Sequence, residues 1–365
     1  MRGGSSAGSS VSVTRGASHR RPPGQADYGR PVPSPSTAPT RTGRLLREDG
    51  DELYYEAVGN PDGPAVLWLH GGPGSGADDG HGRRIDPLRQ QSITFDQRGC
   101  GRSRPLATAL VDQGRPDLLD RNTTPAQIDD IEALRRHLGI DRWMVTGASW
   151  GATLALAYAQ AHPGRVTAVA LFAVTNTSTA EVEWITEAMG RVFPEEWERF
   201  ASAVDRAPGE RVVDAYARAM RDPAPDVRAR AAEAWGRWED VHVSLGPGWR
   251  PDPRWQDPQV REVLATLITH YWSRSGFGGD ETLGRMDRLA GVPGVLIHGR
   301  HDISSPLVTA WRVHRAWPGS ELVVLGDGHG GTDSIGELER AIARLAGGRP
   351  RPRPPGAAPG AAPGA

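Results

Sequence analysis

The sequence predicts an α/β fold in which a mostly parallel central sheet carries an inserted all-helical cap. Short apolar runs typical of buried strands alternate with helical patterns over residues 44–175 and 290–347. Residues 176–289 instead form charged, alanine-rich stretches without a strand pattern, and they contain seven of the twelve tryptophans. We expect most of these tryptophans to fill a helical core and one or two to line a pocket. Because the segment interrupts the strands, we expect it to cover the strand ends, where open α/β sheets bind ligands.

The first elements of the predicted sheet are antiparallel. Residues 44–47 and 53–58 flank an Asp-Gly pair at 49–50, which is typical of a β-hairpin turn. The later apolar runs are continuous, and this indicates parallel strands buried on both faces. These strands are predicted at residues 65–69, 93–95, 143–145, 166–172, 294–297 and 321–325.

One helix between the strands has clear boundary signals. Residues 124–127 read Thr-Pro-Ala-Gln, which we interpret as a capping box that begins at Thr124, with proline at the first helical position. Apolar residues follow at helical spacing until Gly139. The helix therefore leads directly into the strand at 143–145.

The two ends of the 365-residue chain differ from the predicted core. Residues 1–43 are rich in Gly, Ser, Pro and Arg, and residues 348–365 are rich in Pro, Gly and Ala. Such segments bury too little apolar surface to offset the entropy lost on ordering, so we expect a disordered N-terminal extension and a disordered C-terminal tail. Neither carries the apolar stretch of a secretory signal, and no run of eighteen apolar residues predicts a membrane-spanning helix.

The composition argues against several classes of partner. The 43 basic residues are balanced by 44 acidic ones, and no basic block in the core suggests nucleic-acid binding. The single cysteine, Cys100, excludes an internal disulfide framework and favours a cytoplasmic location. Cys100 lies in a glycine-rich loop without a predicted base, so we expect it to be structural.

A serine between two glycines is the first candidate for catalysis. Residues 147–151 read Gly-Ala-Ser-Trp-Gly, with a predicted strand before them and helix-forming residues after them until Pro163. This strand, turn and helix are typical of a nucleophile elbow, which lifts the serine hydroxyl clear of its backbone. Ser149 is therefore the predicted nucleophile, and the alternative is a bystander serine in a glycine-rich turn.

A serine nucleophile needs a base and an acid that orients the base. Asp302 and His329 each lie in a loop just after a predicted strand. The order Ser149, Asp302, His329 is the one expected for an α/β-hydrolase fold. His298 and His301 are rival candidates for the base, but both precede the acid in the sequence.

The same chemistry needs two N–H donors for the oxyanion of the tetrahedral intermediate. Trp150, the residue after the nucleophile, is expected to supply one of them. The second donor should come from residues 70–74, His-Gly-Gly-Pro-Gly, where missing side chains let the backbone approach the substrate. We predict Gly72 or Gly71 as this donor, with Gly72 preferred.

Five motifs together resemble those of proline iminopeptidases, α/β-hydrolases that cleave an N-terminal proline from peptides. The resemblance covers roughly residues 43–345 and implies Ser149, Asp302 and His329 as the triad. The motifs are HGGPG at 70–74, DQRGCGRS at 96–103, NTT at 122–124, GASWGATLALAYAQAHP at 147–163 and HGRHD at 298–302.

The resemblance also implies how the cap recognises a substrate. In the family, acidic residues of the cap hold the substrate's free amino group, and one lies in a Trp-Glu dipeptide that resembles Trp238-Glu239. We therefore expect Glu239 to anchor the amine by a charge-assisted hydrogen bond; the alternative is a solvated glutamate on a cap helix. A second family acid corresponds to Ile268 here, and residues 171–178 lack the Arg-Gly pair of close relatives. Both departures leave the strictness of proline specificity open.

The sequence thus predicts a serine hydrolase, an aminopeptidase that releases N-terminal proline or another small residue through an acyl-enzyme. This chemistry requires no metal or cofactor, and the expected partner is a small peptide or small molecule. The alternative keeps the triad but acts on an ester, lactone or amide of a small metabolite, and a requirement for a free amine separates the two. A third interpretation, a binding protein without catalysis, is disfavoured by the intact triad and glycine-rich loop.

Overall fold

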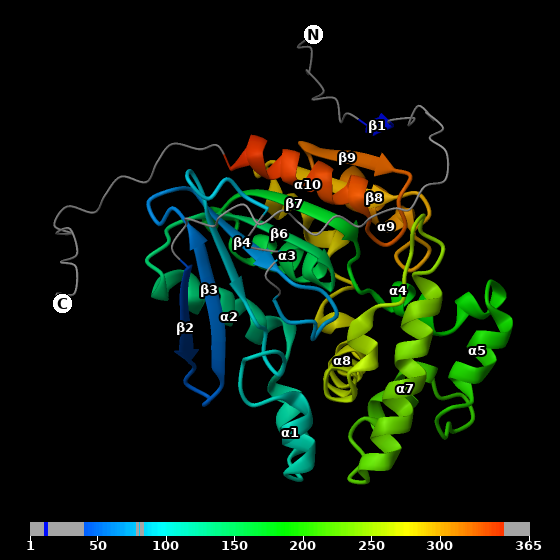
Figure 1. Ribbon diagram of the computed structural model, residues 1–365. Helices are drawn as coiled ribbons and strands as arrows, with labels where there is room; N and C mark the ends of the chain where they lie inside the picture. Colours follow the sequence, from blue (N-terminus) through cyan, green and yellow to red (C-terminus); the bar gives the residue numbers. More distant parts are fainter. Residues whose placement is uncertain (1–10, 14–39, 78–79, 81–83, 347–365) are drawn as a thin grey trace, which may run out of the picture.

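The central feature of the computed structural model is a nine-stranded sheet with helices on both faces (Figure 1). The structure describes residues 11–13, 40–77, 80 and 84–346. Within them the strand order is β1-β9-β8-β7-β6-β4-β5-β3-β2, and each neighbouring pair from β1 to β5 in this order is parallel. The predicted α/β fold with a mostly parallel sheet is confirmed.

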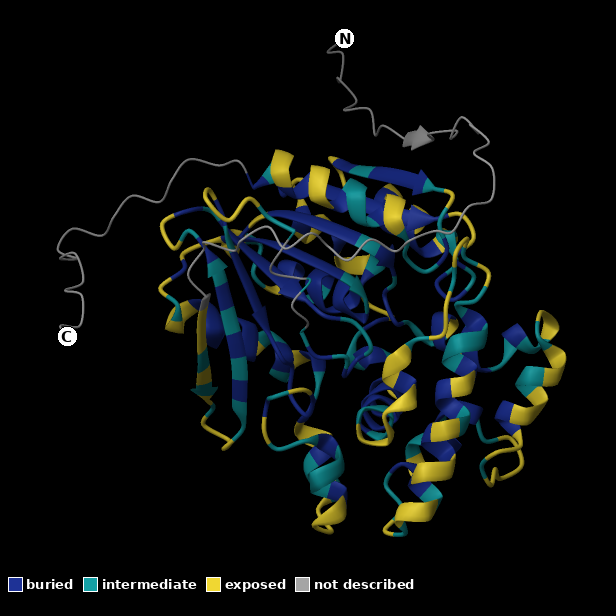
Figure 2. Ribbon diagram, in the orientation of Figure 1, coloured by how far each residue is buried: buried dark blue, intermediate teal, exposed yellow. Residues whose placement is uncertain are grey.

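The inner strands are largely buried on both faces, as their continuous apolar runs predict (Figure 2). Alternate side chains of β4 enter two separate clusters: Leu67 contributes to one with helices α2 and α3, and Trp68 to another with helix α10. Two layers of helix are therefore held against one sheet. The strands are β4 (Ala65–Leu69), β5 (Gln91–Phe95), β6 (Trp143–Ser149), β7 (Val166–Val174), β8 (Gly294–Gly299) and β9 (Ser320–Leu325).

The predicted hairpin forms one edge of the sheet. Strands β2 (Thr40–Leu46) and β3 (Glu52–Gly59) are antiparallel, and β3 continues antiparallel to β5. At the opposite edge β1 (Val11–Val13) runs parallel to β9. Both β1 and the start of β2 lie within residues 1–43, where we expected a disordered extension. The expectation was wrong for these two segments, because even a short Val-Ser-Val run can pair its backbone with an edge strand. The rest of that extension, and residues 348–365, lie outside the described residues.

Helices of the core cover both faces of the sheet. They are α2 (Thr124–His137), α3 (Trp150–Ala161), α9 (Leu307–Ala316) and α10 (Thr332–Leu345), with the 3₁₀ turn η3 (Pro163–Arg165). Helix α1 (Ala107–Asp112) and the 3₁₀ turn η2 (Pro116–Arg121) project away from the sheet, and α1 packs against the helix at Pro258–Trp272 (Figure 1). Among the helices of the described residues, none combines the length and the apolar composition needed to cross a bilayer.

The cap of helix α2 lies one residue earlier than predicted. Thr123, and not Thr124, is the N-cap, and its hydroxyl accepts a hydrogen bond from the Ala126 N–H at 3.3 Å. Thr124 instead donates its hydroxyl to the carbonyl of Gly276, at 2.6 Å. The two adjacent threonines give the same local signal, and only this tertiary contact decides which of them caps the helix.

Between β7 and β8 the chain forms the helical segment that the sequence predicted (Figure 1). Residues 176–289, all of which the structure describes, contain helices and turns but no strand. We call this segment the cap. Its helices are α4 (Thr179–Thr186), α5 (Pro194–Ala201), α6 (Val212–Ala219), α7 (Pro225–His242) and α8 (Pro258–Trp272), with 3₁₀ turns η4 (Ala188–Arg191), η5 (Pro253–Gln256), η6 (Ser275–Phe277) and η7 (Leu283–Leu289).

Aromatic side chains form the interior of the cap. The ring of Phe200 stacks on Tyr216 and on Trp238, with centroid distances of 4.7 and 5.0 Å. Trp235 meets both Phe200 and Tyr216 edge to face. Trp235 and Trp238 therefore serve packing within the cap, while Trp272 at the end of α8 lines a cavity.

Candidate active site

Ser149 lies at a sharp turn between strand β6 and helix α3. Its φ of 54° and ψ of −127° are unusual for a residue with a side chain. The flanking glycines permit this turn: a Cβ on Gly147 would lie 2.5 Å from the carbonyl oxygen of Gly151, and a Cβ on Gly151 would lie 2.1 Å from that of Leu69. The local geometry is thus that of the predicted nucleophile elbow.

The structure brings the three predicted triad residues together. Nε2 of His329 lies 3.0 Å from Oγ of Ser149, and Nδ1 of His329 lies 2.9 Å from Oδ2 of Asp302. Oδ1 of the buried Asp302 accepts a hydrogen bond from the Ser305 N–H at 2.8 Å. Because β6, β8 and β9 are parallel, the loops that carry these residues meet at the carboxyl ends of the strands.

The charges around His329 favour its protonated form. Burial alone lowers the pKa of His329, but the carboxylate of Asp302 and, more weakly, those of Glu239 and Glu181 raise the pKa above its ordinary value. Burial raises the pKa of Asp302, yet His329, His298 and the Ser305 N–H together lower it by more, so the pKa of Asp302 lies below its ordinary value. An ionised Asp302 can therefore stabilise an imidazolium on His329.

Neither rival histidine has a hydrogen bond to Ser149 among those of the described residues, although Nε2 of His298 lies 3.7 Å from Oδ2 of Asp302. Nδ1 of the buried His298 accepts from the Val174 N–H at 3.1 Å, while its Nε2 donates to the carbonyl of Ser305 at 2.7 Å. These two bonds fix a neutral tautomer, and burial lowers the pKa of His298. His301 is exposed, and its Nδ1 lies 2.8 Å from the carbonyl oxygen of Gly326.

The glycine-rich loop at 70–74 packs against the elbow. A Cβ on Gly71 would meet the carbonyl oxygen of Ala148 at 3.1 Å, and Gly72 has a φ of 106° that favours glycine. Gly72 and Trp150 both line the cavity that contains Ser149. The indole N–H of Trp150 donates to the Gln97 side chain at 2.9 Å, so the ring is fixed beneath the site.

Both polar and apolar side chains line the cavity beside Ser149. Sequence analysis missed most of its lining, because these residues come from loops and helix ends that meet only in the folded chain. Glu181 alone had a local signal, since Ser178 and Glu181 have capping-box spacing at the start of α4. Trp272 is one of the cap tryptophans of which one or two were expected to line a pocket. The residues we had not predicted are Thr175, Thr177, Glu181, Val182, Ile185, Ser304 and Ser305.

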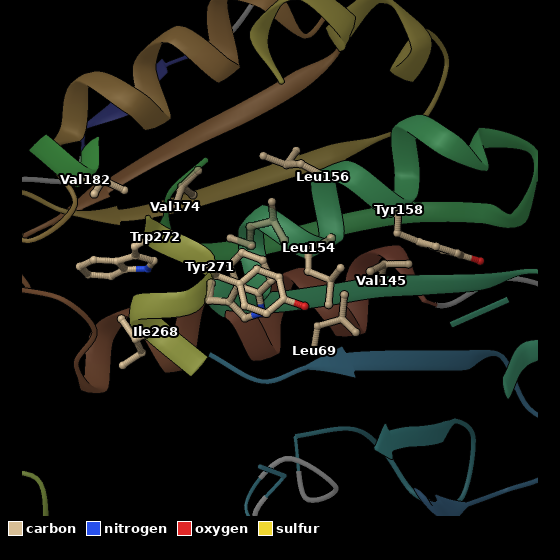
Figure 3. Packing of buried hydrophobic residues seen from close by; sticks show 14 of the residues in the cluster. Leu69, Val145, Leu154, Leu156, Tyr158, Val174, Val182, Ile268, Tyr271 and Trp272 are labelled. Carbon is tan, nitrogen blue, oxygen red and sulfur yellow. The ribbon is translucent and has the colours of Figure 1, made fainter. Parts of the chain in front are cut away.

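Glu239 lies on cap helix α7, close enough to raise the pKa of His329 but not among the residues that line the cavity. Its Oε1 accepts from the indole N–H of Trp235 at 2.9 Å, and its Oε2 lies 3.3 Å from Nε2 of His242. Ile268 is buried on α8, one turn before Trp272 (Figure 3). The carboxylate of Glu239 is thus held in place but is not itself part of the cavity wall.

Cys100 is buried and is not among the residues that line the cavity. Its Sγ lies 3.2 Å from the carbonyl oxygen of Gln97 and 3.6 Å from Nε2 of His70. Burial raises the pKa of the thiol far above its usual range, so a thiolate is not formed near neutral pH. In the described part of the chain, no group of three or more His, Cys, Asp or Glu side chains is placed to hold a metal ion.

The sheet, the elbow and the strand-end loops define the class of protein. Residues 64–331 match the family model of the alpha/beta hydrolase fold, so the chain is an α/β-hydrolase. Within that class it is 42% identical over 324 residues to the probable proline iminopeptidase of Streptomyces coelicolor, which covers 86% of this chain and 98% of the relative. It is 38% identical over 299 residues to the proline iminopeptidase of Xylella fastidiosa strain Temecula1, and this match covers 81% of this chain and 92% of the relative. The chain therefore belongs to the proline iminopeptidase family.

A solved structure is similar in fold. The proline iminopeptidase of Mycobacterium smegmatis superimposes with a TM-score of 0.56 at 20% sequence identity. The match covers 84% of this chain and 97% of that one. At this identity the likeness supports the architecture alone.

Proposed function

We propose that this protein is a serine aminopeptidase that releases an N-terminal proline, or another small residue, from peptides through an acyl-enzyme. One observation carries the proposal: a continuous hydrogen-bond chain links Asp302 through His329 to Ser149, and Ser149 and His329 line a cavity together with residues of the cap. The membership of the proline iminopeptidase family supports the reaction class.

The first half of the reaction forms the acyl-enzyme. Nε2 of His329 accepts the proton of Ser149 as Oγ attacks the carbonyl carbon of the first peptide bond. Asp302 holds the imidazole through Nδ1 and stabilises the imidazolium that results. His329 then gives the proton to the leaving amine, and the shortened peptide departs.

The second half hydrolyses the ester on Ser149. Water attacks the acyl carbon, with His329 again as the base, and the free amino acid is released. In both halves the backbone N–H groups of Gly72 and Trp150 stabilise the negative charge on the carbonyl oxygen. Because the neutral imidazole is the base, kcat/KM should fall as the pH drops through the pKa of His329, which lies above the ordinary 6.5.

Glu239 is proposed as an anchor for the substrate's amino group. The proposal is supported by the Trp238-Glu239 dipeptide on cap helix α7, which resembles the family's amine anchor, and Glu239 also acts to raise the pKa of His329. The hydrogen bond from Trp235 restrains the carboxylate and leaves lone pairs for a second donor. Ile268 supplies no charge from α8, so the anchor relies on other acids around the cavity.

The alternative, a hydrolase of a small-metabolite ester, lactone or amide, is not favoured by the curated relatives. A free-amine requirement tests it directly. We expect prolyl arylamide to be cleaved with a kcat/KM at least about 10-fold above that of its N-acetylated form. The Ser149→Ala variant is the control for background hydrolysis. Equal rates on the free and the blocked substrate would overturn the aminopeptidase proposal and promote the alternative. The cytoplasmic location, based on the single cysteine, stays a prediction.

A further inference from the structure

A carboxylate without an assigned role lies in the same cavity as the nucleophile. Glu181 is in the first turn of cap helix α4, and its backbone N–H donates to the hydroxyl of the N-cap residue Ser178 at 3.4 Å. The side chain is buried, and it lines the cavity together with Ser149 and His329. Glu181 is thus the carboxylate that the cavity wall itself contains.

The two oxygens of Glu181 differ in their surroundings. Oε2 accepts three hydrogen bonds, from the Thr175 hydroxyl, the Asn176 N–H at 3.0 Å and the Thr177 N–H at 2.7 Å. Oε1 is also buried, but no described residue forms a hydrogen bond with it. The hydroxyl of Thr309 on α9 is near enough to favour the charged form, without a hydrogen bond to Oε1. One half of the carboxylate is therefore saturated and the other half is open.

An open, buried carboxylate oxygen is costly unless a donor reaches it. Burial raises the pKa of Glu181, although the three hydrogen bonds to Oε2 and the nearby hydroxyl of Thr309 act to lower it. Among the described residues that line the cavity, no Lys or Arg is present to neutralise this acid. A cation that enters the cavity would supply both the charge and the missing hydrogen bond.

We propose that Oε1 of Glu181 binds the α-amino group of the substrate's N-terminal residue. Glu181 and Ser149 line the same cavity, and in a peptide only the α-carbon separates the α-amino group from the carbonyl carbon that Ser149 attacks, so one bound residue can meet both side chains. The apolar side chains of Val182, Ile185 and Trp272 complete the wall and suit a small apolar residue or a pyrrolidine ring. The inference rests on the proposed aminopeptidase function, and it makes Glu181 a determinant of specificity beside Glu239.

Glu181 also supports the local backbone, and a test must separate the two roles. Its Oε2 holds the loop of Thr175 and Thr177, where Thr177 has a φ of 52°. In Glu181→Gln the amide oxygen can still accept these hydrogen bonds, while the NH₂ group replaces the open Oε1 and removes the charge. The substitution therefore keeps the loop support and removes the amine anchor.

The experiment compares Glu181→Gln with wild type on two substrates, prolyl arylamide and a p-nitrophenyl ester that has no amino group. We expect kcat/KM for the arylamide to fall about 10 to 150-fold, and that for the ester to fall by less than about threefold. Inhibition by L-prolinol, which has the amine but no acyl group, should weaken by a similar factor of about 10 to 150. The matched control is Glu183→Gln, an exposed glutamate on the same helix, which should behave as wild type on both substrates.

The outcomes distinguish this inference from the proposed function. A wild-type enzyme that does not prefer the free amine overturns the proposed function. A wild-type preference that persists unchanged in Glu181→Gln overturns only the role of Glu181, and so does an equal loss on arylamide and ester. Circular dichroism establishes folding. Should Glu181→Gln not fold, Glu181→Asp, which withdraws the charge by one methylene, is expected to lower the arylamide rate at least about 10-fold more than the ester rate.

Discussion

The sheet side and the cap side of the cavity hold their polar groups in different ways. On the sheet side, Ser149, His329 and Asp302 form a closed chain of hydrogen bonds that ends on a backbone N–H. On the cap side, Glu181 lines the cavity, and its Oε1 has no hydrogen-bond partner within the described residues. The proposed reacting groups are thus set before a substrate binds, whereas the cap side has a polar atom that a ligand in the cavity can satisfy.

This difference suggests that chemistry and recognition can be changed separately. A substitution on the sheet side should affect every substrate, because each must pass through the same acyl-enzyme. A substitution of an acid on the cap side should affect only substrates that carry the group it binds.

Removal of a triad side chain should have the largest effect. We expect Ser149→Ala, Asp302→Asn and His329→Ala each to lower kcat by at least about 10³-fold, on arylamide and ester alike, because each interrupts the same proton transfer. Steady-state kinetics on both substrates measure the loss, and circular dichroism should be unchanged. Near-wild-type turnover by folded Ser149→Ala would remove the serine mechanism.

The glycine behind the elbow should be nearly as sensitive. A Cβ on Gly151 would lie 2.1 Å from the carbonyl oxygen of Leu69, so in Gly151→Ala either the elbow or the end of β4 must shift. Displacement of a nucleophile by about 1 Å can cost about 10²-fold in rate, and we expect a loss of that size on both substrates together with a lower Tm.

Gly164→Ala is the matched control, because a Cβ there meets no atom within 4 Å. It should retain wild-type kinetics and Tm. If Gly151→Ala were equally silent, the close packing of the elbow on β4 would not be needed for activity.

Sequence reasoning predicted the sheet side far better than the cap side. Local sequence patterns of a few residues predict the strands, the elbow and the loops of Asp302 and His329. Parallel pairing of the strands then brings the elbow and the two loops together at the carboxyl ends of the strands. The cavity wall has no such signal, because Val182, Ile185 and Trp272 come from two helices whose packing no local pattern specifies. The Ser178–Glu181 spacing indicated only that a helix begins there.

The cap-side prediction concerns Glu239. Loss of one charge-assisted hydrogen bond should cost roughly 1.5–3 kcal/mol, so Glu239→Gln should lower kcat/KM for prolyl arylamide by about 10 to 150-fold. The ester, which has no amino group, should lose less than about threefold. Glu233→Gln on the same helix is the control, because Glu233 is exposed and pairs only with Arg237 among the described residues. Equal losses on the arylamide and the ester would place Glu239 with the sheet-side groups and contradict the separation.

Cys100 should give the smallest effect, because it belongs to neither side of the cavity. The thiol packs in a small apolar cluster with Leu119 and Leu267, and its neighbour His70 already accepts the Gln97 N–H through Nε2, at 3.1 Å. Cys100→Ser places a hydroxyl in this apolar cluster and should lower the free energy of unfolding by about 1 kcal/mol, while kcat/KM stays within about twofold of wild type. Urea denaturation and arylamide kinetics measure the two quantities, and Cys100→Ala separates the effect of the hydroxyl from that of the lost sulfur. A folded Cys100→Ala without activity would show that the thiol takes part in the reaction, and the raised pKa that burial gives it makes that outcome unexpected.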